Sequence, residues 1–89
     1  MQSRLTRLRA LHAELLAALD QGDVAAVRAL VQERAEQLAA LQAEFGAAAA
    51  SDRTAIQPAL RELLPLDRQL QDRATGLRDE LRSELDRQA

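Results

Sequence analysis

Residues 15–27, LLAALDQGDVAAV, join two segments whose apolar residues repeat with the period of an α-helix. The run LDQGD interrupts that pattern. Gly22 can adopt the left-handed backbone conformation that ends a helix. Asp23 can cap a following helix by accepting a hydrogen bond from its first free N–H groups. This stretch therefore predicts a tight turn between two antiparallel helices.

Upstream of the turn, residues 3–20 are predicted to form a helix with one leucine face, made of Leu5, Leu8, Leu11, Leu15, Leu16 and Leu19. Downstream, residues 24–50 are predicted to form a second helix. Leu30 lies at the margin of its inward face, which consists of Val24, Val27, Val31, Leu38, Leu41 and Phe45.

A third and longer helix is predicted over residues 54–87, where Thr54 and Gln57 fit a capping box. Pro65 should bend this helix, and Gly76 is a second weak point. Its apolar stripe consists of Ile56, Leu60, Leu63, Leu70, Ala74, Leu77, Leu81 and Leu85. With short connections, the fold class is all-α: an antiparallel three-helix up-down-up bundle with a long third helix, forming one domain over residues 1–89.

Each apolar face has one polar interruption: His12, Arg34 and Asp67. Helix residues rise by about 1.5 Å each, so residues at one level of an antiparallel hairpin are equidistant from its turn. His12 and Arg34 are equidistant from residue 23, and Arg34 and Asp67 from the point between residues 50 and 51. We expect a buried polar layer that fixes helix register, and a loss of about 3–5 kcal/mol in Arg34→Ala. The alternative function for this layer is a proton relay or ligand site.

The same level rule predicts that residues beyond about 76 extend past the first helix. Leu77, Leu81 and Leu85 continue the apolar row there, with nothing in the chain left to cover them. An uncovered leucine row indicates a surface for a partner helix or a second copy. The alternative is a third helix that folds back at Gly76 or frays at its end.

Composition excludes several classes of protein. The net charge is −2 and the arginines are dispersed, which argues against nucleic-acid binding. The absence of cysteine excludes disulfides, iron–sulfur clusters and a thiol nucleophile. A single histidine without cysteine, tyrosine or lysine leaves too few groups for a general acid–base pair or a metal site. We therefore predict no enzyme, no cofactor and no metal.

An all-helical chorismate mutase would be similarly small, but its pocket needs several convergent basic side chains, and only Arg34 points inward. The arginine-rich start superficially suggests a targeting segment, which His12 and Glu14 interrupt. No stretch approaches the roughly 20 apolar residues of a membrane span. We expect a cytoplasmic protein.

Three segments carry a resemblance to a known family: LLAALDQGD at residues 15–23, VQERAEQLAAL at 31–41 and LLPLDRQLQDRATGLRDEL at 63–81. Together they resemble the FliT-type flagellar export chaperones and, more distantly, the FlgN type. The third segment, with its acidic residue inside the leucine stripe, is the most characteristic.

The resemblance implies a small helical chaperone of bacterial flagellum biogenesis. It would bind the C-terminal region of the flagellar filament-cap protein, keep that subunit monomeric and deliver it to components of the type III export apparatus. The binding groove would map to Leu41, Phe45, Leu63, Leu66, Leu70, Leu77 and Leu81, and the overhang adds Leu85. The sequence stops at Ala89 without the fourth helix of longer members, which leaves open any self-masking of the groove or role in transcriptional control. A structural coiled-coil subunit that forms a homodimer through the end of the third helix is the alternative.

Overall fold

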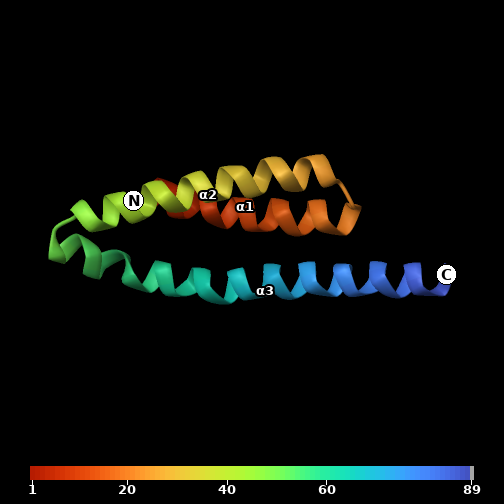
Figure 1. The fold of residues 1–89 in the computed structure, drawn as a ribbon. Helices are drawn as coiled ribbons and strands as arrows, with labels where there is room; N and C mark the ends of the chain where they lie inside the picture. The colour runs from red at the N-terminus through yellow and green to blue at the C-terminus, as the bar shows by residue number, and fades with distance from the viewer. Residues whose placement is uncertain (89) are drawn as a thin grey trace.

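The computed structural model describes residues 1–88 as three helices, α1 (Gln2–Gln21), α2 (Val24–Ala47) and α3 (Ala50–Gln88). Successive helices run in opposite directions, and α3 is the longest (Figure 1). No strand occurs within the described residues. The prediction of an all-α, up-down-up bundle with a long third helix is confirmed.

The turn between α1 and α2 follows the predicted chemistry. Gly22 has φ 68° and ψ 24°, the left-handed conformation. The N–H of Gly22 donates to the carbonyl of Leu19 at 3.2 Å, and the N–H of Asp23 donates to Ala18 at 3.0 Å. These two bonds satisfy carbonyl groups that the helix end would leave open. Asp23 Oδ1 accepts a hydrogen bond from the N–H of Ala26 at 3.1 Å and so caps α2.

The second turn differs from the prediction. Helix α2 ends at Ala47 and α3 already begins at Ala50, so Thr54 lies inside α3, where its hydroxyl donates to the carbonyl of Ala50 at 3.0 Å. The predicted capping box is therefore wrong. Arg53 stabilises this turn instead: its Nη2 donates to the carbonyl of Gly46 at 2.8 Å, and its guanidinium lies 5.7 Å from the centre of the Phe45 ring.

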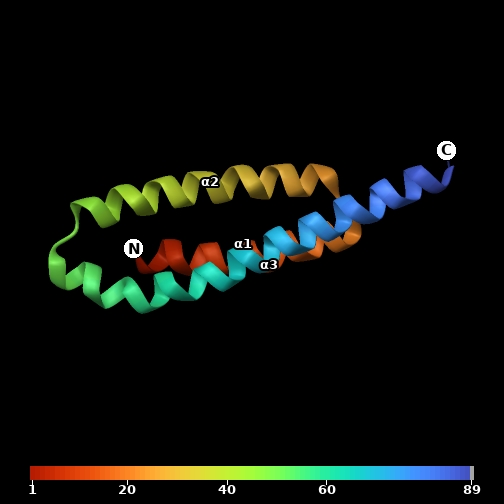
Figure 2. The same cartoon turned by 60° about the horizontal axis from the view of Figure 1, so that its bottom comes forward.

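Helix α3 contains both prolines, Pro58 and Pro65, and continues through Gly76 to Gln88. Its first turns run in a different direction from the rest (Figure 2), as expected where proline removes a backbone hydrogen bond. The helix does not fold back at Gly76. The long overhanging third helix is thus continuous within the described residues.

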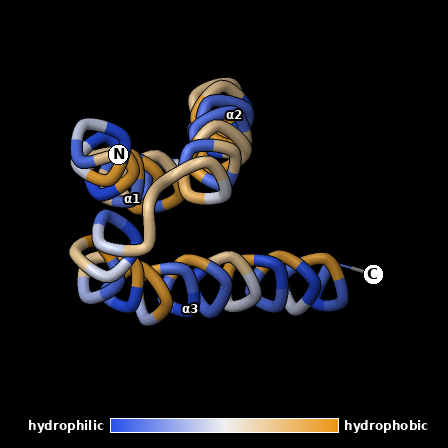
Figure 3. The backbone as a smooth tube through the Cα atoms, turned by 90° about the vertical axis from the view of Figure 1, so that its left-hand side faces the viewer, coloured by the Kyte–Doolittle hydropathy of each residue, from blue (hydrophilic) through white to orange (hydrophobic). Residues whose placement is uncertain are grey.

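Helix α1 lies at the centre and packs against both α2 and α3, whereas α2 and α3 approach each other less closely. Seen along α1 and α2, α3 runs obliquely across the pair rather than parallel to it (Figure 3). The core lies where all three helices meet, between the first half of α1 and the turn from α2 to α3. Its buried residues are Leu5, Leu8, Leu11, Leu41 and Ile56.

Charged pairs border this core. Arg7 Nη2 donates to Glu33 Oε2 at 2.6 Å, and Arg4 binds Gln37 at 2.9 Å and also Glu44. These bonds join α1 to α2. The hydrogen bond from Arg4, the largest cause, lowers the pKa of the Glu44 carboxyl group, which also lies 3.4 Å from the amino group of Met1. The hydrogen bond to Glu33 likewise raises the pKa of Arg7.

Candidate functional site

Arg34 of α2 and Asp67 of α3 form an ion pair across the gap between their helices. Their side chains are 28% and 42% exposed, so the pair is half-buried. His12 Nε2 lies 3.2 Å from Gln69 Oε1, while its buried Nδ1 has no hydrogen-bond partner among the described residues. His12, Arg34 and Asp67 line one small cavity of about 20 Å³.

The three residues therefore share one level of the bundle, but the level is not the buried layer that we expected. Helices α2 and α3 pack little against each other, and both charged side chains remain partly exposed to water. No charged or polar residue is fully buried within residues 1–88. The pair instead marks a boundary: the closed core lies on one side and open space between α2 and α3 lies on the other.

Immediately beyond the ion pair, a cavity of about 190 Å³ opens between the three helices. Leu15 and Leu19 of α1 contribute to it, together with Val27 and Val31 of α2 and Leu70 and Ala74 of α3. This cavity shares Leu19, Val27 and Ala74 with a larger opening at the end of the molecule. The apolar lining is thus continuous from the ion pair to the turn between α1 and α2.

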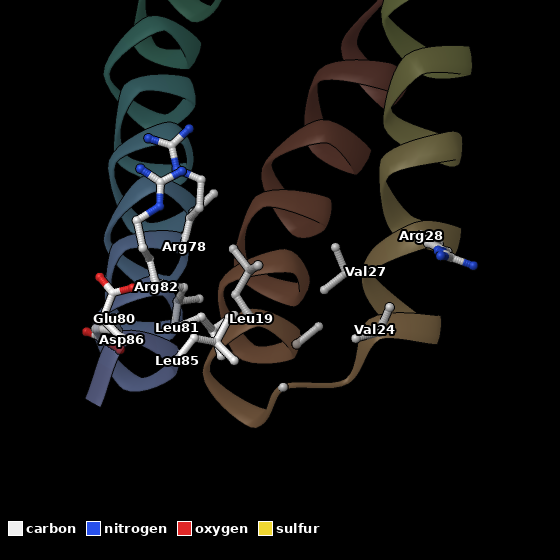
Figure 4. Close-up of a pocket in the computed structure, with 14 residues that line it drawn as sticks. Leu19, Val24, Val27, Arg28, Arg78, Glu80, Leu81, Arg82, Leu85 and Asp86 are labelled. Carbon is white, nitrogen blue, oxygen red and sulfur yellow. The ribbon is translucent and has the colours of Figure 1, made fainter. Parts of the chain in front are cut away.

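The larger opening, the terminal groove, has a volume of about 790 Å³. The end of α1, the start of α2 and the last turns of α3 form its walls (Figure 4). Leu81 and Leu85 point from α3 toward Leu19 and remain 66% and 67% exposed. The apolar wall residues that define the groove are Leu19, Val24, Val27, Leu77, Leu81 and Leu85.

This shape can hold an elongated apolar ligand that lies between α2 and α3. Contiguous exposed apolar side chains in a concave site are typical of protein-interaction surfaces. The long leucine row, the turn at Gly22 and the acidic residue in the third helix are also the features on which the sequence resemblance rests. The family model described as "Flagellar protein FliT" matches residues 2–88.

The chain belongs to the FliT family. This family is one of flagellar export chaperones, so the chain is placed among proteins that assist flagellar export. No curated protein and no solved structure matches it. Among the described residues, no helix is long and apolar enough to cross a membrane, and no three His, Cys, Asp or Glu side chains are grouped as for a metal ion.

The residues predicted to line a partner groove in this FliT-family chain lie in three different places. Leu41 is only 4% exposed and belongs to the core, so its assignment to a binding groove is corrected. Phe45 and Leu63 are partly buried against that core. Leu66 and Leu70 line the small cavity at the ion pair. Only Leu77, Leu81 and Leu85 line the terminal groove.

Three groove residues, Leu19, Val24 and Val27, were not predicted as such. The apolar pattern did include them, as part of the faces expected to be core. In the structure Val24 and Val31 are exposed, because α2 turns Leu30, Leu38, Leu41 and Phe45 toward the core and leaves the valines facing the opening beside α3. Periodicity identifies an apolar face without showing whether another helix covers it.

Proposed function

We propose that this chain is a flagellar export chaperone that binds the C-terminal region of the flagellar filament-cap protein in the terminal groove. The observation that carries the proposal is the apolar lining of that groove, in which Leu81 and Leu85 stay about two-thirds exposed in a chain of the FliT family. The assignment of the cap protein as partner rests on the resemblance to FliT-type chaperones. The proposal includes delivery of the bound subunit to the export apparatus.

Physical chemistry supports a protein partner at this groove. Covering apolar area contributes roughly 25 cal/mol per Å². The four leucines and two valines that line the groove are left partly open, so they favour occupation by another apolar surface. Binding in the groove would also cover the apolar surface of the exported subunit that contacts it. A chaperone that covers such a surface keeps the subunit from self-associating.

The first test is calorimetric titration of the full chain with the C-terminal helical segment of the filament-cap protein from the same genome. We expect one-to-one binding with a micromolar or lower dissociation constant. Leu81→Asp should weaken it at least about tenfold, because a carboxylate would enter an apolar wall. Leu64→Asp is the matched control, since Leu64 is 68% exposed on α3 and does not line the groove.

Absence of heat with a folded chain would refute the filament-cap assignment. A dimer in solution that Leu81→Asp disperses would favour the alternative function, a structural subunit that self-associates through the end of α3. The exposed Leu81 and Leu85 are the observation that favours this alternative. Equal weakening by Leu64→Asp would place the binding surface outside the groove.

A further inference from the structure

Ion pairs across helix seams follow one rule in this molecule. Each pair of helices is joined by at least one ion pair in which an arginine on one helix meets a carboxylate on the other. The pairs are Arg4 with Glu44, Arg7 with Glu33, Arg9 with Glu62, Arg34 with Asp67, and Arg73 with Asp20. Charge complementarity therefore accompanies each seam between apolar helix faces.

Among the described residues, several arginines take no part in such a cross-helix pair, Arg28, Arg61 and Arg68 among them, and neither do Arg78 and Arg82. Both line the terminal groove, one helical turn apart on α3. Among residues 1–88, Arg78 is paired only with its chain neighbour Asp79, at 3.7 Å, and Arg82 has no carboxylate partner. Two like charges at positions i and i+4 of a helix repel each other. These arginines border the one apolar wall of α3 that no helix of the described chain covers.

The carboxylates that line the groove are fewer than its arginines. Two carboxylates, Glu80 and Asp86, line the groove on α3 together with the two arginines. Glu80 lies 4.0 Å from Arg73, which also binds Asp20 on α1. The groove lining holds three arginines, Arg28, Arg78 and Arg82, against these two carboxylates. It is thus slightly positive, although the chain carries a net charge of −2.

The wall has the shape that accepts a helix. Leu77, Leu81 and Leu85 form a straight row that spans about 12 Å, or two helical turns. Rows of this kind pack into the grooves between side chains of a second helix. A guest helix seated on the row would bring its own flanking residues next to Arg78 and Arg82, as happens at the other seams.

We propose that the guest is an amphipathic helix of the partner protein whose apolar ridge is flanked by two carboxylates at positions i and i+4, which pair with Arg78 and Arg82. The inference rests on the proposed function and adds the chemistry that selects the partner. Leucines supply most of the binding, and the two arginines select an acidic flank and fix the direction of the guest helix.

The test uses two synthetic helical peptides of about 18 residues, five turns, with one leucine ridge in common. One carries glutamate at the two flanking positions and the other carries lysine. Titration into the full chain at low salt should show the glutamate peptide binding about tenfold more tightly. The double variant Arg78→Glu/Arg82→Glu should reverse this preference. Arg68→Glu, at an exposed position of α3 outside the groove, should leave it unchanged.

Equal affinity for the two peptides would overturn the inference. It would also be overturned if Arg68→Glu changed the peptide preference as much as the double variant does, because the preference would then reflect net charge alone. Failure of both peptides while the filament-cap segment binds would refute the acidic-flank inference and leave the proposed function standing. If the cap segment fails to bind while the glutamate peptide binds selectively, the filament-cap assignment is refuted and the acidic-flank inference stands. Circular dichroism of each variant confirms that the chain is folded.

Discussion

The two ends of the bundle are built from the same leucine pattern, yet one end is closed and the other is open. At the closed end, Leu5, Leu8 and Leu11 of α1 are buried beneath α2 and α3. At the open end, Leu19 faces Leu81 and Leu85 across the terminal groove. The difference arises because α3 crosses α1 obliquely, so that α3 and α2 are close at their shared turn and diverge toward the other end (Figures 1 and 3). Burial is therefore a property of helix placement as well as of sequence pattern.

The largest expected effect is a difference in stability between leucine-to-alanine variants at the closed end and at the open end. Leu11→Ala should destabilise the chain by about 2–5 kcal/mol, because Leu11 is fully buried and its loss leaves a cavity. Leu81→Ala, with the same change in side chain at the open end, should stay within about 0.5 kcal/mol. Urea denaturation followed by circular dichroism measures both.

Comparable losses in the two variants would mean that the groove is closed in solution, by α3 itself or by a second copy. Concentration dependence of the Leu81→Ala midpoint distinguishes these, since only self-association makes stability depend on protein concentration. If Leu11→Ala fails to fold, the milder Leu11→Val still tests the closed end, with an expected loss of about 1 kcal/mol.

The second effect concerns the boundary between the two ends. Arg34→Ala should cost about 1 kcal/mol, less than the 3–5 kcal/mol expected from the sequence, because the pair with Asp67 is half-exposed and screened by water. A double-mutant cycle with Asp67→Ala isolates the pairwise free energy. A loss of 3 kcal/mol or more would show that the pair is desolvated in solution, and thus that α2 and α3 lie closer together.

The features that the sequence predicted correctly are those set by local backbone chemistry. The turn at Gly22 and Asp23, the extension of α3 past the end of α1 and the pairing level of Arg34 and Asp67 follow from backbone preferences and helical rise. The start of α3 was missed because Thr54 and Gln57 fit a capping box, although α3 begins four residues before Thr54.

For the site, the sequence predicted that Leu77, Leu81 and Leu85 form an uncovered row, and the structure places all three on the groove. It misassigned Leu41 and did not assign Val24 or Val27 to the groove. Those errors share one physical cause: the crossing angle of α3 depends on packing between distant residues, which periodicity within one helix does not contain.

The smallest effect concerns the charged pairs that border the core at the closed end, in particular Arg4 with Glu44. The hydrogen bond from Arg4 lowers the folded-state pKa of Glu44 below its ordinary value of 4.5. The resulting stabilisation is present above about pH 4.5 and is lost as the pH falls through the lowered pKa of the folded state. Denaturation midpoints measured from about pH 6 down to about pH 3 should therefore fall less steeply in Glu44→Gln than in the unaltered chain.

Arg4→Gln removes the main cause of that pKa shift, although it keeps the Glu44 carboxyl group. The denaturation midpoint of this variant should therefore also fall less steeply as the pH is lowered. An unchanged slope in both variants would assign acid sensitivity to other carboxylates. Because Glu44 joins α1 to α2 beside the core, its protonation should loosen the closed end and leave binding at the terminal groove intact.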